Sequence, residues 1–226
     1  FVDKYKFSAA YSMLYLFSLA GTVGVFFTND LRFLFFFFEL VVWTSLFLIP
    51  MGDSKKAASW YYGFSALGSF SLLFAVLLIF KATGNFNVAS IGTVDQYNVA
   101  IFFLLIIAAF AKLGAFPLHI WLPKVLTNSP DPITALFSGG LEKLGAFVAV
   151  LGLVKLAPVG TMISLNGYIN MTTASYFIAI LGSMTIVFGT LMAIRQDDAK
   201  TLLAYSSMSN GGYILVALAM MNSTAL

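Results

Sequence analysis

Residues 97–125 read YNVAIFFLLIIAAFAKLGAFPLHIWLPKV, an apolar run that holds two lysines, a glycine and two prolines. The run is longer than the roughly 20 residues that a helix needs to cross a bilayer. Lys112 lies within it, and we expect the helix to break near Gly114 and Pro117, because proline lacks a backbone donor and clashes with the preceding turn. Broken backbone is tolerated at membrane depth only where protein or a watery cavity satisfies its polar groups. The run therefore predicts a broken membrane helix with a lysine at the break.

The remainder of the chain is also apolar. Of its 226 residues, 60% are hydrophobic and 9% are charged, and the mean hydropathy is +0.94, outside the range of soluble domains. An all-α membrane protein with about seven transmembrane helices is predicted, one of them broken mid-membrane. The predicted spans are Phe7–Thr28, Leu31–Pro50, Ala57–Thr83, Tyr97–Val125, Ile133–Leu156, Ala174–Arg195 and Ala199–Met221. Short loops join them, so residues 1–226 are expected to form one bundle, and the opening on Phe1 indicates a fragment of a longer subunit.

Composition also excludes several kinds of site. The chain has no cysteine, which excludes disulfides and iron–sulfur or zinc sites built on thiolates. Its formal charge is only +3 and forms no basic stripe, so nucleic-acid binding has no support. No cofactor, metal site or catalytic redox site is expected in this chain.

Lysine and arginine fall unequally at the two ends of the predicted spans. Seven lie on one side and three on the other, with two lysines left inside. The positive-inside rule makes the richer side cytoplasmic. That side holds Lys4, Lys6, Lys55, Lys56, Lys124, Arg195 and Lys200, and the opposite side holds Arg32, Lys81 and Lys155.

Four charged residues lie in the middle of apolar runs, namely both glutamates of the chain, Glu39 and Glu142, and the lysines Lys112 and Lys143. Ionisable groups inside a bilayer are costly, rare and usually functional. This pattern indicates a protein that moves charge.

Each of these residues also has a purely structural interpretation. Glu39 could be a protonated carboxyl group bonded to a backbone carbonyl, and Lys112 could snorkel toward the interface. Lys143 could be the counter-ion of Glu142, although adjacent helix positions do not face each other. His119 suits proton shuttling, or it orients the break.

Four motifs, in order along the chain, resemble the Mrp-antiporter-like subunit family. Residues 24–40 (GVFFTNDLRFLFFFFEL) resemble the family's fourth and fifth helices, and residues 112–123 (KLGAFPLHIWLP) resemble its broken seventh helix. Residues 129–145 (SPDPITALFSGGLEKLG) resemble its eighth helix, and residues 195–213 (RQDDAKTLLAYSSMSNGGY) resemble the connection from the ninth to the tenth. Such subunits form the proton-pumping arms of respiratory complex I, membrane-bound hydrogenases and multisubunit Mrp sodium/proton antiporters, so the resemblance implies a proton-translocating subunit of a multisubunit membrane complex.

The resemblance implies roles for the buried charges. Glu39 corresponds to a glutamate that pairs with Lys112, and Lys143 to a central lysine that passes protons onward. From its residue type rather than from the resemblance, His119 is a candidate for the same relay. Glu142 is not expected in the family motif, and it is a candidate local charge modulator or interface contact. A carboxylate beside a buried lysine favours its protonated form, so separating Glu39 from Lys112 is expected to release a proton toward Lys143.

The resemblance also implies an organisation. Residues 7–156 correspond to a first repeat of five helices, and residues 174–226 to the start of a second, inverted repeat. The chain is then expected to be an integral subunit of a prokaryotic cell membrane. Its expected partners are lipid, other membrane subunits, and protons with Na⁺ as a second candidate ion. The driving reaction, in a hydrogenase, complex I or Mrp assembly, would take place outside this chain.

Some residues depart from the family pattern. Ser138 stands where complex I members often carry histidine, Phe38 where they carry tryptophan, and Asn210 where histidine or glutamine is common. The first two departures favour the D-type branch of the Mrp antiporter subunits and its hydrogenase relatives. Two other functional classes stay open: an independent small-solute transporter with a broken-helix site, and a structural membrane subunit.

Overall fold

The computed structural model describes residues 9–52, 54–156, 159–160, 162–165 and 169–221. Lys4 and Lys6, which were predicted to lie on the cytoplasmic side, are outside these ranges. The α-helices are α1 (Ala9–Phe27), α2 (Leu31–Leu48), α3 (Lys55–Thr83), α4 (Asn98–Leu113), α5 (Trp121–Asn128), α6 (Asp131–Leu136), α7 (Lys143–Val150), α8 (Thr173–Ile194) and α9 (Ala199–Met221). Two short 3₁₀ turns, η1 (Ile49–Met51) and η2 (Val88–Thr93), and two π-helical segments, η3 (Phe137–Leu141) and η4 (Leu151–Lys155), complete the helical structure.

The predicted spans are confirmed. Among the described residues, six helices are long and apolar enough to cross a membrane, and the shorter apolar helix Asn98–Leu113 joins them. One of the six is the composite Asp131–Lys155, which runs through α6, η3, α7 and η4. Outside the helices, β1 (Met162–Leu165) and β2 (Ile169–Thr172) form a short antiparallel hairpin between η4 and α8.

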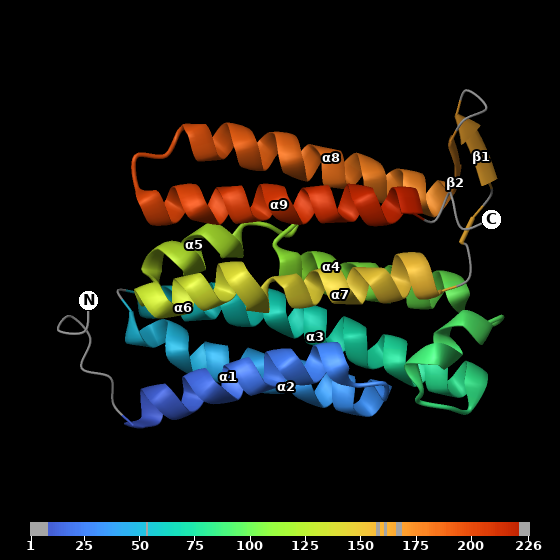
Figure 1. The fold of residues 1–226 in the computed structure, drawn as a ribbon, viewed down its shortest axis with the longest axis horizontal. Coiled ribbons are helices and arrows are strands. Elements are labelled where there is room, and N and C mark those ends of the chain that lie inside the picture. The colour runs from blue at the N-terminus through green and yellow to red at the C-terminus, as the bar shows by residue number, and fades with distance from the viewer. Residues whose placement is uncertain (1–8, 53, 157–158, 161, 166–168, 222–226) are drawn as a thin grey trace.

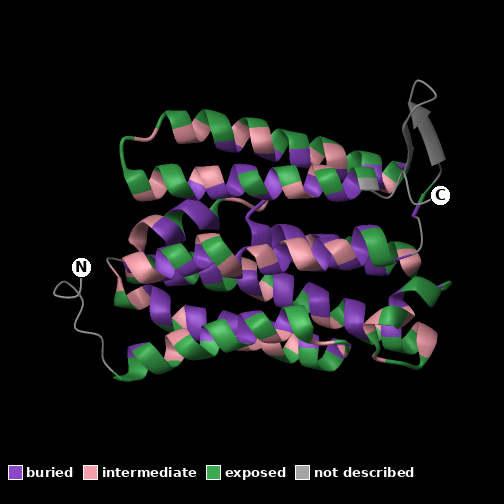
Figure 2. Ribbon diagram, in the orientation of Figure 1, coloured by how far each residue is buried: buried purple, intermediate pink, exposed green. Residues whose placement is uncertain are grey.

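The helices lie side by side along one direction, and the chain passes back and forth between two ends (Figure 1). One end carries the start of α3, the turn between α5 and α6, and the turn between α8 and α9; the hairpin lies at the other end. The predicted alternation of the basic residues between two sides therefore agrees with the path of the chain. Buried residues concentrate between the helices of the bundle (Figure 2).

The outward faces of the long helices are apolar. Phe36, Phe70 and Leu191, from α2, α3 and α8, expose 57%, 61% and 59% of their surface. Apolar side chains of this size on the outside of a bundle are typical of a surface in contact with lipid or other membrane subunits.

The turn between α1 and α2 is fixed by local charge. Asp30 is the N-cap of α2, and its carboxylate accepts hydrogen bonds from the Arg32 backbone and side chain. The side-chain bonds of Arg32 hold the pKa of Asp30 at about 2, below the ordinary value of 3.8. A carboxylate at a helix N-terminus also pairs favourably with the free backbone donors there.

The predicted break is confirmed. Helix α4 ends at Leu113, and Gly114 follows with φ of +62°, a conformation that favours glycine. A Cβ atom at Gly114 would lie 2.9 Å from the Leu122 side chain. The helix resumes as α5 at Trp121, with a non-helical stretch that includes Pro117 in between.

The backbone freed by the break finds side-chain partners. The Trp121 indole donates to the Ala111 carbonyl at 2.9 Å. The Phe116 backbone N–H donates to Thr185 of α8 at 3.1 Å. Protein groups thus satisfy the broken segment, as the low-dielectric surroundings require.

Candidate functional site

Lys112 is buried at the last turn of α4 with only 2% of its surface exposed. Its Nζ donates a hydrogen bond to the Tyr61 hydroxyl of α3 at 3.1 Å. The same atom lies 5.1 Å from the centre of the Phe38 ring and 5.3 Å from that of Tyr61. Aromatic faces attract a cation at such distances, so the pocket is suited to hold an ammonium group without a carboxylate in contact.

The aromatic pocket of Lys112 is coupled to the break. The Tyr61 ring packs edge-on against Trp121 and Phe137, each at 5.5 Å between ring centres. Trp121 begins α5 and bonds Ala111 across the break. A change in the broken helix would therefore reach the partner of Lys112 through a contact between rings.

The sequence predicts that Glu39 and Lys112 approach within ion-pair range or through one water, and among the described residues they form no direct ion pair. The buried Oε1 of Glu39 makes no hydrogen bond to those residues either. Glu39 instead lines a cavity of about 100 Å³ between α2 and α3, with Tyr62 and Ser69. Successive helix residues point about 100° apart, so Phe38 faces Lys112 and turns its neighbour Glu39 away.

Lys143 forms an ion pair with Glu142, its neighbour in the chain. Their Nζ and Oε1 atoms are 3.1 Å apart, and the side chains are 26% and 0% exposed, respectively. The structure thus has the arrangement in which Lys143 is the counter-ion of Glu142, the interpretation that the divergence of adjacent helix positions disfavoured. The flexible four-carbon stem of lysine reaches back to a carboxylate that has no access to solvent.

Glu142 also joins the composite helix to α9. The Ser207 hydroxyl of α9 donates to its Oε2 at 2.5 Å, and Ser138 donates in turn to Ser207 at 3.2 Å. Glu142 directly follows η3, where its N–H bonds the Phe137 carbonyl at 3.1 Å. Such i→i+5 segments occur often at functional sites.

Lys112 and Lys143 lie on helices that touch at close range. A Cβ atom at Gly145 of α7 would stand 2.6 Å from the Ala109 carbonyl and 2.7 Å from the Leu113 nitrogen of α4. Lys112 precedes Leu113, and Lys143 comes two residues before Gly145. The contact therefore brings both lysine positions to a similar depth in the bundle.

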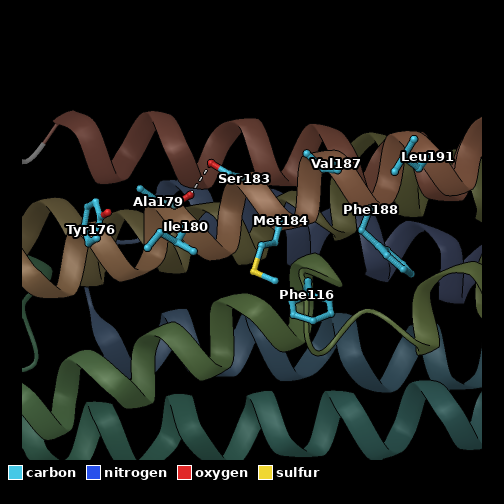
Figure 3. Close-up of a pocket in the computed structure, with 9 residues that line it drawn as sticks. All are labelled: Phe116, Tyr176, Ala179, Ile180, Ser183, Met184, Val187, Phe188 and Leu191. Atoms are coloured by element: carbon cyan, nitrogen blue, oxygen red, sulfur yellow. Dashed lines mark hydrogen bonds between the residues drawn. The ribbon is translucent and has the colours of Figure 1, made fainter.

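His119 lies at the break against α8. Its ring packs against Phe116 at 5.6 Å and Phe188 at 4.8 Å between centres, and its buried Nδ1 has no hydrogen-bond partner among the described residues. Next to it, Phe116 faces an apolar groove of about 610 Å³ along α8 (Figure 3). The hydroxyl of Ser183 in that groove bonds its own helix at the Ala179 carbonyl (Figure 3).

Two residues of the site, Tyr61 and Ser207, were not identified from the sequence. Tyr61 gives no signal, because it is one of several aromatic residues in an apolar run. Ser207 belongs to a serine-rich stretch of α9 that contains Ser206 and Ser209 as well. That stretch could have drawn attention, because hydroxyl groups clustered in a membrane helix seek partners on neighbouring helices.

Comparison with known proteins gives one family over most of the chain. The family described as "NADH:quinone oxidoreductase/Mrp antiporter, TM" matches residues 28–226. The chain is 33% identical over 235 aligned residues to the D subunit of the Na⁺/H⁺ antiporter of Alkalihalophilus pseudofirmus, covering 99% of this chain and 44% of that protein. It is 30% identical to "Putative antiporter subunit mnhA2" of Staphylococcus aureus, covering 91% of this chain and 25% of that one.

Two solved structures share the fold. A chain of the archaeal membrane-bound sulfane sulfur reductase, a respiratory membrane complex, is 32% identical with a TM-score of 0.79, covering 95% of this chain and 36% of that chain. A chain of the Mrp complex from Dietzia sp. DQ12-45-1b superimposes with a TM-score of 0.82 at 24% identity, covering 94% of this chain and 23% of that chain. The chain spans less than half the length of each of these relatives.

Proposed function

Since the chain belongs to the NADH:quinone oxidoreductase/Mrp antiporter membrane family, we propose that it forms part of an antiporter-like subunit that moves protons within a multisubunit membrane complex. It is an integral, multi-pass membrane protein by family and by its apolar helices. The observation that carries the proposal is Lys112: an ionisable side chain, 2% exposed, at the break of a membrane helix. A buried lysine at such a place is costly, and ionisable groups inside membrane segments usually serve transport or another function.

Lys112 and Lys143 are the proton carriers of the proposed route. The close contact of α4 and α7 supports transfer between the two lysines, with water as the intervening carrier. Beyond Lys143, the Glu142 carboxylate and the Ser207 hydroxyl form the next polar groups toward α9. Glu142 acts in this proposal as the modulator that holds Lys143 in place.

Glu39 is the group that controls Lys112 from a distance. Its unpartnered Oε1 and the cavity beside it suit a carboxylate that changes partners during the cycle. His119 serves the same relay at the break, where its buried Nδ1 has no hydrogen-bond partner among the described residues and its imidazole suits proton shuttling.

The proposal also includes the division of the chain into two repeats and its orientation in the membrane. Residues 7–156 form the first repeat and residues 174–226 begin the second. The end that carries Lys55, Lys124 and Lys200 faces the cytoplasm, supported by the excess of basic residues there. The partners are other membrane subunits, as the two complexes named above suggest.

Proton uptake into vesicles that contain the complete complex tests the proposal. Lys112→Ala should lower the uptake at least tenfold. Lys81→Ala is the matched control, because Lys81 is exposed at the end of α3 and contacts the Tyr97 ring. Uptake of radioactive Na⁺ in the same vesicles distinguishes sodium from protons as the moved ion. Unchanged uptake of both ions in Lys112→Ala would refute the proposal.

A further inference from the structure

A polar cavity of about 270 Å³ lies where α3 begins and α5 ends. Lys56 and Lys124 line it from the two helices, together with Ser54, Trp60 and Asn128. Both ammonium groups are on exposed residues, and Lys124 Nζ lies 3.4 Å from the centre of the Trp60 ring. This contact fixes one cation beside the indole at the rim of the bundle.

An apolar groove continues from this cavity along α3. It has a volume of about 620 Å³, shares Lys56 and Trp60 with the polar cavity, and runs on past Gly63 and Phe64 to Leu67. These residues recur every three or four positions and so share one face of the helix. Gly63 leaves a notch in that face, because a Cβ atom there would meet nothing within 4 Å.

The dimensions of the groove match one leaflet of a membrane. From Lys56 to Leu67 the helix rises roughly 16 Å at 1.5 Å per residue, and half of a bilayer core is roughly 15 Å thick. Trp60 lies near the polar end, where indole rings favour the membrane interface. A cationic cavity that opens into an apolar groove one leaflet long has the shape of a phospholipid.

We propose that this composite site binds an anionic phospholipid. The phosphate and headgroup would lie between Lys56 and Lys124, and one acyl chain would follow Trp60, Gly63 and Leu67. No carboxylate is present among the described residues that line either cavity, so a net negative headgroup is favoured over a zwitterionic one. Basic pockets between membrane helices bind such headgroups.

The site would link two parts of the bundle. Lys56 lies on the first turn of α3, and the same helix carries Tyr61, the hydrogen-bond partner of Lys112. Lys124 lies on α5, the half-helix that follows the break. A bound lipid therefore bridges the helices on both sides of the aromatic pocket without entering it.

Native mass spectrometry of the delipidated, complete complex tests this site by titration with phosphatidylglycerol and phosphatidylcholine of the same chains. Phosphatidylglycerol should bind more tightly. The double variant Lys56→Ala/Lys124→Ala should weaken that binding roughly thirtyfold, since each basic residue near a membrane contributes about fivefold. Lys55→Ala is the matched control, because Lys55 is exposed on the same turn and lines neither cavity.

A second variant tests the groove independently of the lysines. Gly63→Leu fills the notch and should weaken binding of both lipids, whereas soluble glycerol phosphate should not compete with either. Unchanged phosphatidylglycerol binding by the double variant would overturn the proposal. Equal competition by glycerol phosphate would overturn it as well, since the site would then recognise a free phosphate.

Discussion

The hydroxyl oxygen of Tyr61 lies 3.1 Å from Nζ of Lys112, and 51 positions separate the two residues along the chain. This bond joins α3 to the helix that breaks. Phe38 covers the same ammonium from α2, so three helices contribute to the pocket. The lysine is held by an oxygen and two rings, while Glu39, the carboxylate expected beside it, lines a different cavity.

Tyr61→Phe should slow proton uptake by the complete complex about tenfold. A hydrogen bond to a charged group is worth about 1.5–3 kcal/mol, and about 1.4 kcal/mol corresponds to tenfold in rate. The phenyl ring keeps the contacts with Trp121 and Phe137, so assembly should not change. Tyr213→Phe is the control, since Tyr213 is 58% exposed on α9 and lines neither the Lys112 pocket nor the Glu39 cavity. Equal rates for the Tyr61 variant and the unmutated complex would mean that the bond is not used in transport.

The sequence predicts the membrane helices and the break well, because these depend on local composition. An apolar run of spanning length and a proline three positions after a glycine determine the backbone within a few residues of themselves. The partners of Lys112 could not be predicted in this way. Tyr61 and Phe38 come from other helices, and only packing decides which of the many aromatic side chains faces the ammonium.

The Glu142–Lys143 pair shows where a local rule fails. Side chains at adjacent helix positions diverge, and this argued against their contact. The rule describes exposed helices, where water competes for each charge. In the bundle Glu142 has no exposed surface, and the flexible Lys143 side chain bends back to its carboxylate.

Gly145→Ala should destabilise the bundle by about 1–3 kcal/mol, the usual cost of overpacking a filled contact. The added Cβ would press on the backbone of α4 at Ala109 and Leu113. The unfolding temperature of the detergent-purified complex should fall, and thermal unfolding measures this change. Gly63→Ala is the matched control, with open space around its Cβ, and it should be neutral or slightly stabilising because alanine favours a helix. A similar effect of both changes would contradict the close contact.

The stabilising contribution of Asp30 should depend on pH. Its pKa is about 2 in the folded chain and 3.8 ordinarily, so the folded state binds its proton less readily. The contribution is therefore complete above pH 3.8 and is lost as the pH falls through about 2. Thermal unfolding of Asp30→Ala and the unmutated complex should differ at pH 7 and converge near pH 2. A difference that persists at the acidic end would mean that the carboxylate charge is not its source.

Lys143→Ala should abolish proton uptake and also weaken the assembly, because it leaves the Glu142 carboxylate buried without its cation. Removing one partner of a buried pair costs about 3–5 kcal/mol. The double variant Glu142→Gln/Lys143→Ala should recover most of that stability, since the amide keeps the bond with Ser207 and carries no charge. Proton uptake should stay absent in the double variant, because the carrier is still missing. Lys143→Arg should keep the pair but impair uptake, as a guanidinium does not release its proton. If the double variant regains both stability and uptake, Lys143 serves only to neutralise Glu142, and the proton passes through other groups.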